Sequence, residues 1–402
     1  MLRRSLILKL FDAFSIQRWN DQIRPVELVE MDKHAHKMAI AWCLARYEED
    51  AGHAVDWHNL IRGGLFELLR RTVLSDIKQP VYQAIRTGHH EAFARLSEWV
   101  FRQLEPLVDD VGVKADLRRY LVDDDLLDET SRRILAAAHF QASLWEFRII
   151  QRMNPGSRLT TRVDRLMNAE LDTHLDLVGM RKLATGALVS DQGGVSDFVD
   201  LVGHLRFQVR WAQTPRIPPT SVLGHSLLVA CLSYLLAREV GACDRRLRND
   251  FFGGLFHDLP ESVTRDIVSP VKRSIPELAE VIGQIEQELA AAEIYPLVEP
   301  SWCDELRYFT TDEFDSKIRE GGTISKITSD AINATFNAPS FDPIDGELIK
   351  VADHLAAYAE AYKSTISGIR TPQLEEGLQL AASWKGRTVG GIDVGAIYGD
   401  FQ

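Results

Sequence analysis

The feature that most constrains this chain is an internal repeat. Residues 62–81 (RGGLFELLRRTVLSDIKQPV) and residues 252–271 (FGGLFHDLPESVTRDIVSPV) align without gaps, and ten of the twenty positions are identical. Self-similarity between distant segments is the mark of a duplicated structural unit, because both copies must fold into the same elements. The chain of 402 residues is therefore expected to contain one fold twice.

Two further pairs of segments flank this repeat in the same order. In the first pair, Arg18-Trp19 begins sixteen residues before His34, and Arg210-Trp211 begins fifteen residues before His225. In the second pair, residues 134–147 (ILAAAHFQASLWEF) resemble residues 349–362 (IKVADHLAAYAEAY). Three anchors in one order predict a duplicated domain. We assign the first copy to residues 1–150, a helical linker to 151–195, the second copy to 196–370, and a tail that packs on the body to 371–402.

The residue pattern of both halves is typical of helices. Leu, Ala, Glu and Arg dominate, apolar residues recur at three- and four-residue spacing, as in residues 227–235, and alternating β-branched runs are almost absent. Residues 154–157 (Asn-Pro-Gly-Ser) should break one helix, and the polar residues 190–194 should form a loop. We predict an all-α protein made of two tandem helical bundles.

Composition excludes several classes of protein. The net charge of −12 and the pI near 5.5 argue against a protein that coats nucleic acid. Four cysteines without a CxxC pair suit a reducing cytosol, so a cytoplasmic location is expected. No apolar run is expected to approach the roughly 18 residues of a membrane span, and no membrane partner is expected. Lys9 and Asp12 interrupt the apolar start, which predicts an amphipathic first helix rather than a signal peptide.

The chemistry-bearing residues are concentrated in the second half. His257 and Asp258 stand side by side at the end of an apolar run, and Glu261 follows one helical turn later. An imidazole beside a carboxylate suits a divalent metal that accepts mixed nitrogen and oxygen ligands. On a continuous helix Glu261 would share a face with this pair.

The repeat serves as an internal control for this assignment. The candidate ligands His257, Asp258 and Asp353 are aligned with Glu67, Leu68 and Ala138. Loss of one metal ion explains all three replacements, whereas separate structural roles would need a separate cause for each. His225, which follows Pro218-Pro219, is the expected fourth ligand. Its counterpart His34 is interpreted as structural.

These motifs carry a resemblance to a known family. The H…HD…D pattern resembles the HD-domain metal-dependent phosphohydrolases, and the YfbR-like bacterial 5′-deoxynucleotidases most of all. The matching motifs are Arg210-Trp211, HDxxE at His257–Glu261, TxDxxxPVK at Thr264–Lys272 and the Asp353–Tyr358 segment. The stretch between Lys272 and Asp353 is longer than this family leads us to expect. The resemblance implies an ion of Mn, Co, Fe, Ni or Zn, held by His225, His257, Asp258 and Asp353.

Roles follow for the residues around the ion. Glu261 is expected to hold the attacking water or move its proton, and Arg210 to bind phosphate oxygens as a bidentate fork. Trp211 would wall off a sugar or base, and Lys272 would attract phosphate. The resemblance suggests that Asp266 assists leaving-group or sugar contacts. Thr264 is replaced by Leu74 in the first copy, which favours a role in the catalytic site.

The internal control leaves alternatives for some of these residues. Arg18-Trp19 retains the Arg-Trp pair in the half without ligands, so Arg210 and Trp211 also suit a role in the fold. Asp266 is retained as Asp76, so helix capping is an equal alternative for it.

The expected activity is hydrolysis of (deoxy)nucleoside 5′-monophosphates. HD sites also hydrolyse triphosphates and phosphodiesters, and a nucleotide-sensing regulator is a third alternative. The expected partner is a small phosphate ester and not a nucleic acid. The chain is expected to be a monomer with an internal pseudo-two-fold or a homodimer.

We predict one transition-metal ion per chain, bound in the second half. Elemental analysis of the purified protein should give one equivalent, and the variant His257→Ala/Asp258→Ala should lose it. Two ions per chain, or full metal content in that variant, would contradict the assignment.

Overall fold

The fold is mainly helical. The computed structural model describes residues 2–75, 77–186, 194–265, 275 and 278–401 and is 71% helical, which confirms the all-α prediction. The helices are α1 (Arg4–Phe11), α2 (Glu30–Asp50), α3 (Trp57–Val73), α4 (Gln79–Gly88), α5 (His90–Leu104), α6 (Val111–Arg118), α7 (Glu129–Met153), α8 (Arg158–Leu171), α9 (Val178–Gly186), α10 (Val195–His204), α11 (Val222–Glu239), α12 (Asp244–Phe256), α13 (Glu261–Thr264), α15 (Leu278–Leu289), α16 (Cys303–Thr310), α17 (Ser329–Ala331), α18 (Gly346–Ile366), α19 (Pro372–Leu378), α20 (Leu380–Trp384) and α21 (Val394–Gly399).

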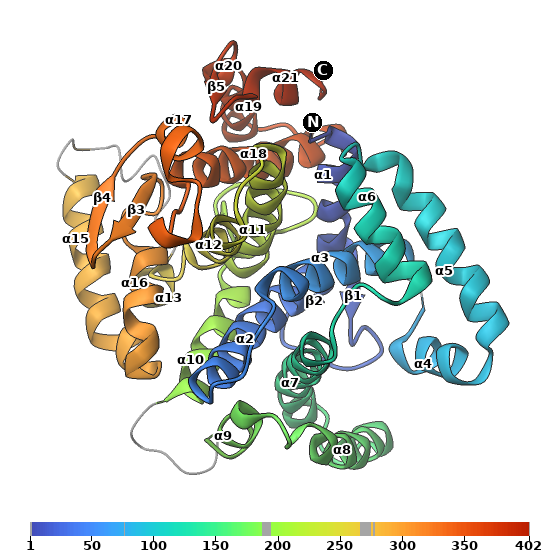
Figure 1. Ribbon diagram of the computed structural model, residues 1–402. Coiled ribbons are helices and arrows are strands. Elements are labelled where there is room, and N and C mark those ends of the chain that lie inside the picture. Colours follow the sequence, from blue (N-terminus) through green and yellow to red (C-terminus); the bar gives the residue numbers. More distant parts are fainter. Residues whose placement is uncertain (1, 76, 187–193, 266–274, 276–277, 402) are drawn as a thin grey trace.

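In the part of the chain that the structure describes, short strands form three two-stranded antiparallel sheets. They are β1 (Gln17–Arg18) with β2 (Leu28–Val29), β3 (Lys317–Glu320) with β4 (Thr323–Lys326), and β5 (Thr388–Val389) with β6 (Ile392–Asp393). The β3–β4 hairpin, together with α15 and α16, belongs to the unexpectedly long stretch between Lys272 and Asp353 (Figure 1).

Helix α11 lies at the centre of the molecule and contacts α2, α12 and α18 (Figure 1). Ser221 caps it by accepting a hydrogen bond from the Gly224 amide. Its 18 residues are long and apolar enough to cross a membrane, so the expectation that no apolar run reaches this length was wrong. However, 89% of the helix is buried inside the protein, as in the core helix of a soluble protein.

Helices from both halves pack in matching pairs. In the first half α2, α3 and α7 contact one another, and in the second half α11, α12 and α18 do the same. The repeated glycine pair explains part of this packing. A Cβ on Gly64 would lie 2.3 Å from the Met38 sulfur on α2, and one on Gly254 would lie 2.9 Å from the Ala230 Cα on α11. The duplication itself stays a prediction.

Aromatic side chains connect the two halves. The Trp42 and Phe256 rings meet edge-to-face with centroids 5.4 Å apart, and Trp57 meets Phe252 at the same distance. Trp42 is fully buried, and Phe256 directly precedes the predicted ligand His257. The packing between the halves therefore extends to the last residue before the candidate site.

The last helices pack against α18. The Tyr358 ring contacts those of Tyr398 and Phe401, with centroids 5.0 and 5.1 Å apart. Trp384 Nε1 donates to His354 Nδ1 at 3.0 Å. Figure 1 shows these C-terminal helices close to α1, and the Arg4 amide donates to Asp400 at 2.7 Å.

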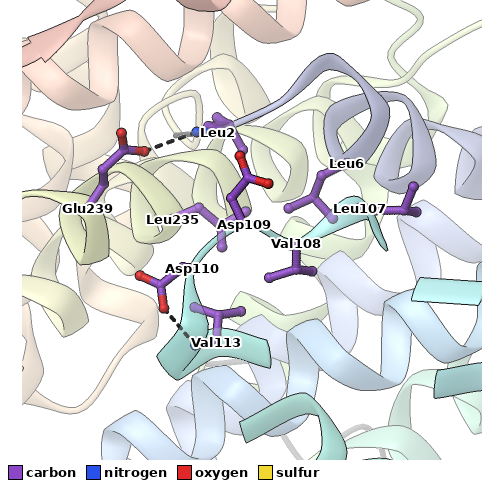
Figure 2. A pocket seen from close by; sticks show the side chains of 9 residues that line it. All are labelled: Leu2, Leu6, Leu107, Val108, Asp109, Asp110, Val113, Leu235 and Glu239. Atoms are coloured by element: carbon purple, nitrogen blue, oxygen red, sulfur yellow. Dashed lines mark hydrogen bonds between the residues drawn. The ribbon is translucent and has the colours of Figure 1, made fainter. Parts of the chain in front are cut away.

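A small cavity of about 160 Å³ lies between α1, α6 and α11. Apolar and acidic side chains line it together, and the acidic ones are Asp109, Asp110 and Glu239 (Figure 2). The Leu2 amide donates to Glu239 at 3.0 Å, which joins the start of the chain to the end of α11. Leu235 in its wall is ten residues beyond His225, or about 15 Å along a helix, so the cavity is separate from the predicted site.

These contacts predict that the second half depends on the first. A fragment of residues 195–402 would expose the faces of α11 and α12 that pack on α2 and α3, so it should be insoluble or poorly active. Its yield and its activity relative to the full chain are the measurements. A soluble, monomeric and fully active fragment would contradict the supporting role of residues 1–150.

Candidate metal centre

His225 lies in the first turn of α11 and is completely buried. Its Nε2 is 2.8 Å from Asp353 Oδ1, and its Nδ1 is 3.3 Å from Glu360 Oε1. Both carboxylates belong to α18. The contact between α11 and α18 thus places one imidazole between two acidic side chains.

His257 follows directly on the last residue of α12. Its Nδ1 lies 2.8 Å from the Gly254 carbonyl oxygen, to which an Nδ1–H donates, so this contact favours the tautomer that leaves Nε2 as an electron-pair donor. Nε2 is buried and makes no hydrogen bond with any residue that the structure describes. It lies 3.2 Å from Asp258 Oδ2 and 3.9 Å from Asp353 Oδ1. A buried nitrogen facing two carboxylates fits a cation.

Three of the four predicted ligands converge, and the fourth lies beside one of them. Ligand atoms of His225, His257 and Asp353 all lie within 4.8 Å of one another, and Asp258 adjoins them through His257. Two imidazole nitrogens and two carboxylates suit Mn, Fe, Co, Ni or Zn. The residues present fit a divalent transition-metal ion.

The charges around the site also favour a cation. Four carboxylates gather here with two guanidinium groups, namely Asp258, Asp353, Glu261 and Glu360 with Arg210 and Arg216. Burial lowers the pKa of His257, but the adjacent Asp258 carboxylate outweighs burial and raises it to about 9. For Asp258, burial raises the pKa, but the His257 imidazole more than compensates and holds it well below its usual range. The site therefore attracts positive charge.

Arg210 lies at the edge of the ligand cluster. Its Nη1 is 3.3 Å from Asp258 Oδ2, and its Nε is 3.5 Å from Glu360 Oε1. Burial lowers the pKa of the guanidinium, but Glu360 and the other nearby carboxylates raise it above its ordinary value. Arg210 is a permanent cation beside a predicted metal ligand.

Trp211 is held by protein contacts on several sides. Its Nε1 donates to Glu360 Oε2 at 2.8 Å, and its ring lies against Arg216 and Gly377. The residue has a φ of 56°, which non-glycine residues adopt infrequently. These contacts match the alternative of a packing role for Trp211.

Glu261 does not continue the helix that ends before His257. Residues 257–260 form turns, and α13 begins at Glu261 directly after Pro260, so the three residues do not share one continuous helix. Proline lacks the amide hydrogen that a continuing helix needs. Glu261 is nevertheless buried, and its carboxylate lies close enough to Arg210 to raise the pKa of the Arg210 guanidinium.

The remaining predicted residues lie in or after α13. The Thr264 hydroxyl donates to the Pro260 carbonyl oxygen at 3.3 Å, within its own turn. Asp266 and Lys272 lie outside the residues that the structure describes.

Glu360 is a site residue that the motif comparison missed. It is fully buried and accepts hydrogen bonds from Trp211 and, at 2.9 Å, from Thr220, while its carboxylate also approaches Arg210 and His225. Burial raises the pKa of Glu360, but Arg210 and the other cations hold it well below its usual range. The available signal was spacing, since Glu360 lies two helical turns after Asp353.

Glu313 is a second missed carboxyl group. Burial raises its pKa, and it interacts electrostatically with His257 and Asp258. It lies in the loop between α16 and β3, where no motif of the sequence marked it.

A hollow of about 620 Å³ lies beside the Arg210–Trp211 segment. Its lining residues are His204, Phe207, Gln208, Val209, Ala212 and Arg265. Gln208 donates to the Glu261 carbonyl oxygen at 3.1 Å, which joins this wall to α13.

Comparison with known families agrees with this geometry. Residues 202–382 match the family model described as HD domain, which covers most of the predicted second copy. Residues 202–382 are thus similar to HD domains, which form a superfamily of metal-dependent phosphohydrolases that bind divalent metals. No curated protein and no solved structure gives a significant match.

We predict that Glu360 orients His225 toward the ion. Glu360→Gln should lower the metal affinity about 10- to 100-fold, because an outer partner of a ligating histidine fixes its orientation. Chelator competition measures this affinity, and thermal unfolding measures stability.

The first half offers a matched control for this variant. Glu146 accepts from Arg18 at 2.8 Å and from Trp19 at 2.9 Å, as Glu360 contacts Arg210 and Trp211. Glu146→Gln should lower the Tm but leave the metal affinity unchanged. Equal losses of affinity in both variants would show that Glu360 acts through stability alone.

Proposed function

We propose that this HD domain hydrolyses phosphate monoesters, with (deoxy)nucleoside 5′-monophosphates as substrates. The observation that carries the proposal is the convergence of His225, His257 and Asp353 within 4.8 Å, with the Arg210 guanidinium beside Asp258. A cation site next to a fixed guanidinium suits a substrate with a doubly charged phosphate group.

The ion would be held by His225, His257, Asp258 and Asp353. When bound, it supplies the Lewis acidity that makes water nucleophilic near neutral pH, and positive charge for a phosphoryl group. Its identity is proposed as Mn, Co, Fe, Ni or Zn, with one ion per chain.

Glu261 is proposed as the group that receives the proton of the attacking water. Its burial and its position at the start of α13, beside Arg210, support this role. A carboxylate in a partly desolvated site can hold a water and accept its proton.

Arg210 is proposed to bind the phosphate oxygens. Its guanidinium is already surrounded by carboxylates, of which Asp258 and Asp353 are assigned to the ion. The hollow beside it has the volume of a typical small-ligand site, and Phe207 and Arg265 in its wall suit a base and an anion. We also propose that Lys272 attracts the phosphate, and that Asp266 and Thr264 belong to the catalytic site.

The cellular setting is part of the proposal. All four cysteines are free, which supports a reducing cytoplasm. We propose a monomer whose two halves are related by an internal pseudo-two-fold axis.

A substrate panel tests the reaction. Mononucleotides, triphosphates and cyclic dinucleotides are incubated with the protein and Mn²⁺ or Co²⁺, and the released products are measured. We expect inorganic phosphate from monophosphates, and fastest from the deoxy forms. Release of triphosphate, or cleavage of the cyclic forms, would instead place the domain among triphosphohydrolases or phosphodiesterases. No turnover of any substrate by metal-loaded protein would favour a nucleotide-sensing role.

We predict that Glu261→Ala keeps the metal and loses turnover. Removal of a general acid or base typically costs about a hundredfold or more in kcat. The exposed Glu293 provides a control, and Glu293→Ala should keep both kcat and metal content. An unchanged kcat in Glu261→Ala would show that Glu261 is a bystander, and loss of the ion would show that it is a ligand.

A further inference from the structure

The first half contains a buried charged cluster at the positions that correspond to the metal centre. The repeat pairs His34 with His225, and Glu67 with His257. Three residues beyond each histidine, the first half has Lys37 where the second half has the buried Leu228. Lys37 therefore places an ammonium group where the second half has the apolar side chain of Leu228.

The ammonium of Lys37 pairs with Glu67, the residue that corresponds to the ligand His257. Its Nζ is 2.5 Å from Glu67 Oε2, and the other carboxylate oxygen, Oε1, is 2.9 Å from His139 Nδ1 and 3.8 Å from His34 Nε2. Lys33 Nζ adds a contact of 2.6 Å with His139 Nδ1. Lys33 and Lys37 are both completely buried.

Each carboxylate of this cluster has a cationic side chain as its partner. Glu67 pairs with Lys37, Glu30 with Arg18 and Arg71, and Glu146 with Arg18 and Arg206. In the second half, carboxylates outnumber guanidinium groups. The cluster in the first half therefore needs no bound cation to pair its carboxylates, whereas the cluster in the second half has carboxylates left for one.

The surroundings of the two clusters are otherwise alike. Trp19 and Trp211 have φ angles of 54° and 56°, and each indole donates to a buried glutamate, Glu146 or Glu360. The arginine before each tryptophan contacts the same glutamate. The frame is thus present in both halves, and the difference lies in what supplies the central positive charge.

We infer that the ammonium of Lys37 takes, in residues 1–150, the place that the metal ion takes in the second half. The inference rests on the repeat and not on the proposed substrate. An ammonium supplies positive charge to Glu67 but no open coordination position, so this half is folded without an ion and without the proposed chemistry. The first half therefore stays folded with or without metal, and its helix α2 packs against α11 in both cases.

Metal stoichiometry tests this inference directly. Two variants of the full chain both carry Lys33→Ala, Glu67→His, Leu68→Asp and Ala138→Asp, which introduce the ligand types of the second half. One variant also carries Lys37→Leu, and the other retains Lys37. After loading with Co²⁺ and gel filtration, elemental analysis should give two ions per chain in the first variant and one in the second. Two ions in both, or one in a folded first variant, would overturn the inference.

A mutant cycle decides the matter even if those variants fail to fold. Lys37→Leu and Glu67→Leu should each lower the Tm by about 5 °C or more, because each leaves a buried charge unpaired, and the double variant should recover most of the loss. These shifts should be the same with EDTA and with saturating Co²⁺. Lys9→Leu, which removes a partly exposed pairing with Asp12, should change the Tm by about 1 °C or less. Additive effects of the two core substitutions would contradict the role of Lys37.

Discussion

The structure depends on how positive charge is supplied to buried carboxylates. Glu360 on α18 is fully buried, and Asp258 and Asp353 are partly buried near it; removing a charge from water costs several kcal/mol unless it is paired. Arg210 provides part of the compensation, and the two imidazoles leave nitrogen atoms facing the same space. An acidic site of this kind is stable with a cation in it, so folding and metal binding are expected to reinforce each other.

The helices achieve this arrangement through close packing. Gly254 lets α12 approach the backbone of α11, and this contact sets His257 opposite His225. Helix α2 supports α11 from the other side, and Trp42 reaches Phe256. The site is thus assembled by elements of both halves, although all of its proposed ligands come from the second. A first half that needs no ion can supply this support at any metal concentration.

Much of the site was predictable because its residues form motifs. The differences between the repeats singled out His257, Asp258 and Asp353, and the structure brings them together with His225 and Arg210. Other features depend on tertiary contacts that no local pattern records. Glu360 contacts Arg210, Trp211 and His225, which lie more than 130 residues earlier in the chain. Glu313 lies in a loop of the long segment before α18, where the sequence carries no motif. The helix break before Glu261 was readable from Pro260 but was overlooked, since the HDxxE spacing suits a helix. Lys37 was missed because an internal lysine in a helical pattern ordinarily indicates an exposed face.

The packing of the last helices on α18 has a thermodynamic consequence. Asp353 faces the ligand cluster, whereas the neighbouring His354 and the next-turn Tyr358 contact Trp384, Tyr398 and Phe401. One rigid helix therefore presents a metal ligand and a docking face for residues beyond 380. By thermodynamic linkage, an ion that orders α18 also strengthens the docking of this segment. Anything that draws the segment away lowers the affinity for the ion by the same factor. Metal occupancy can in this way be sensed at a surface that touches none of the ligands.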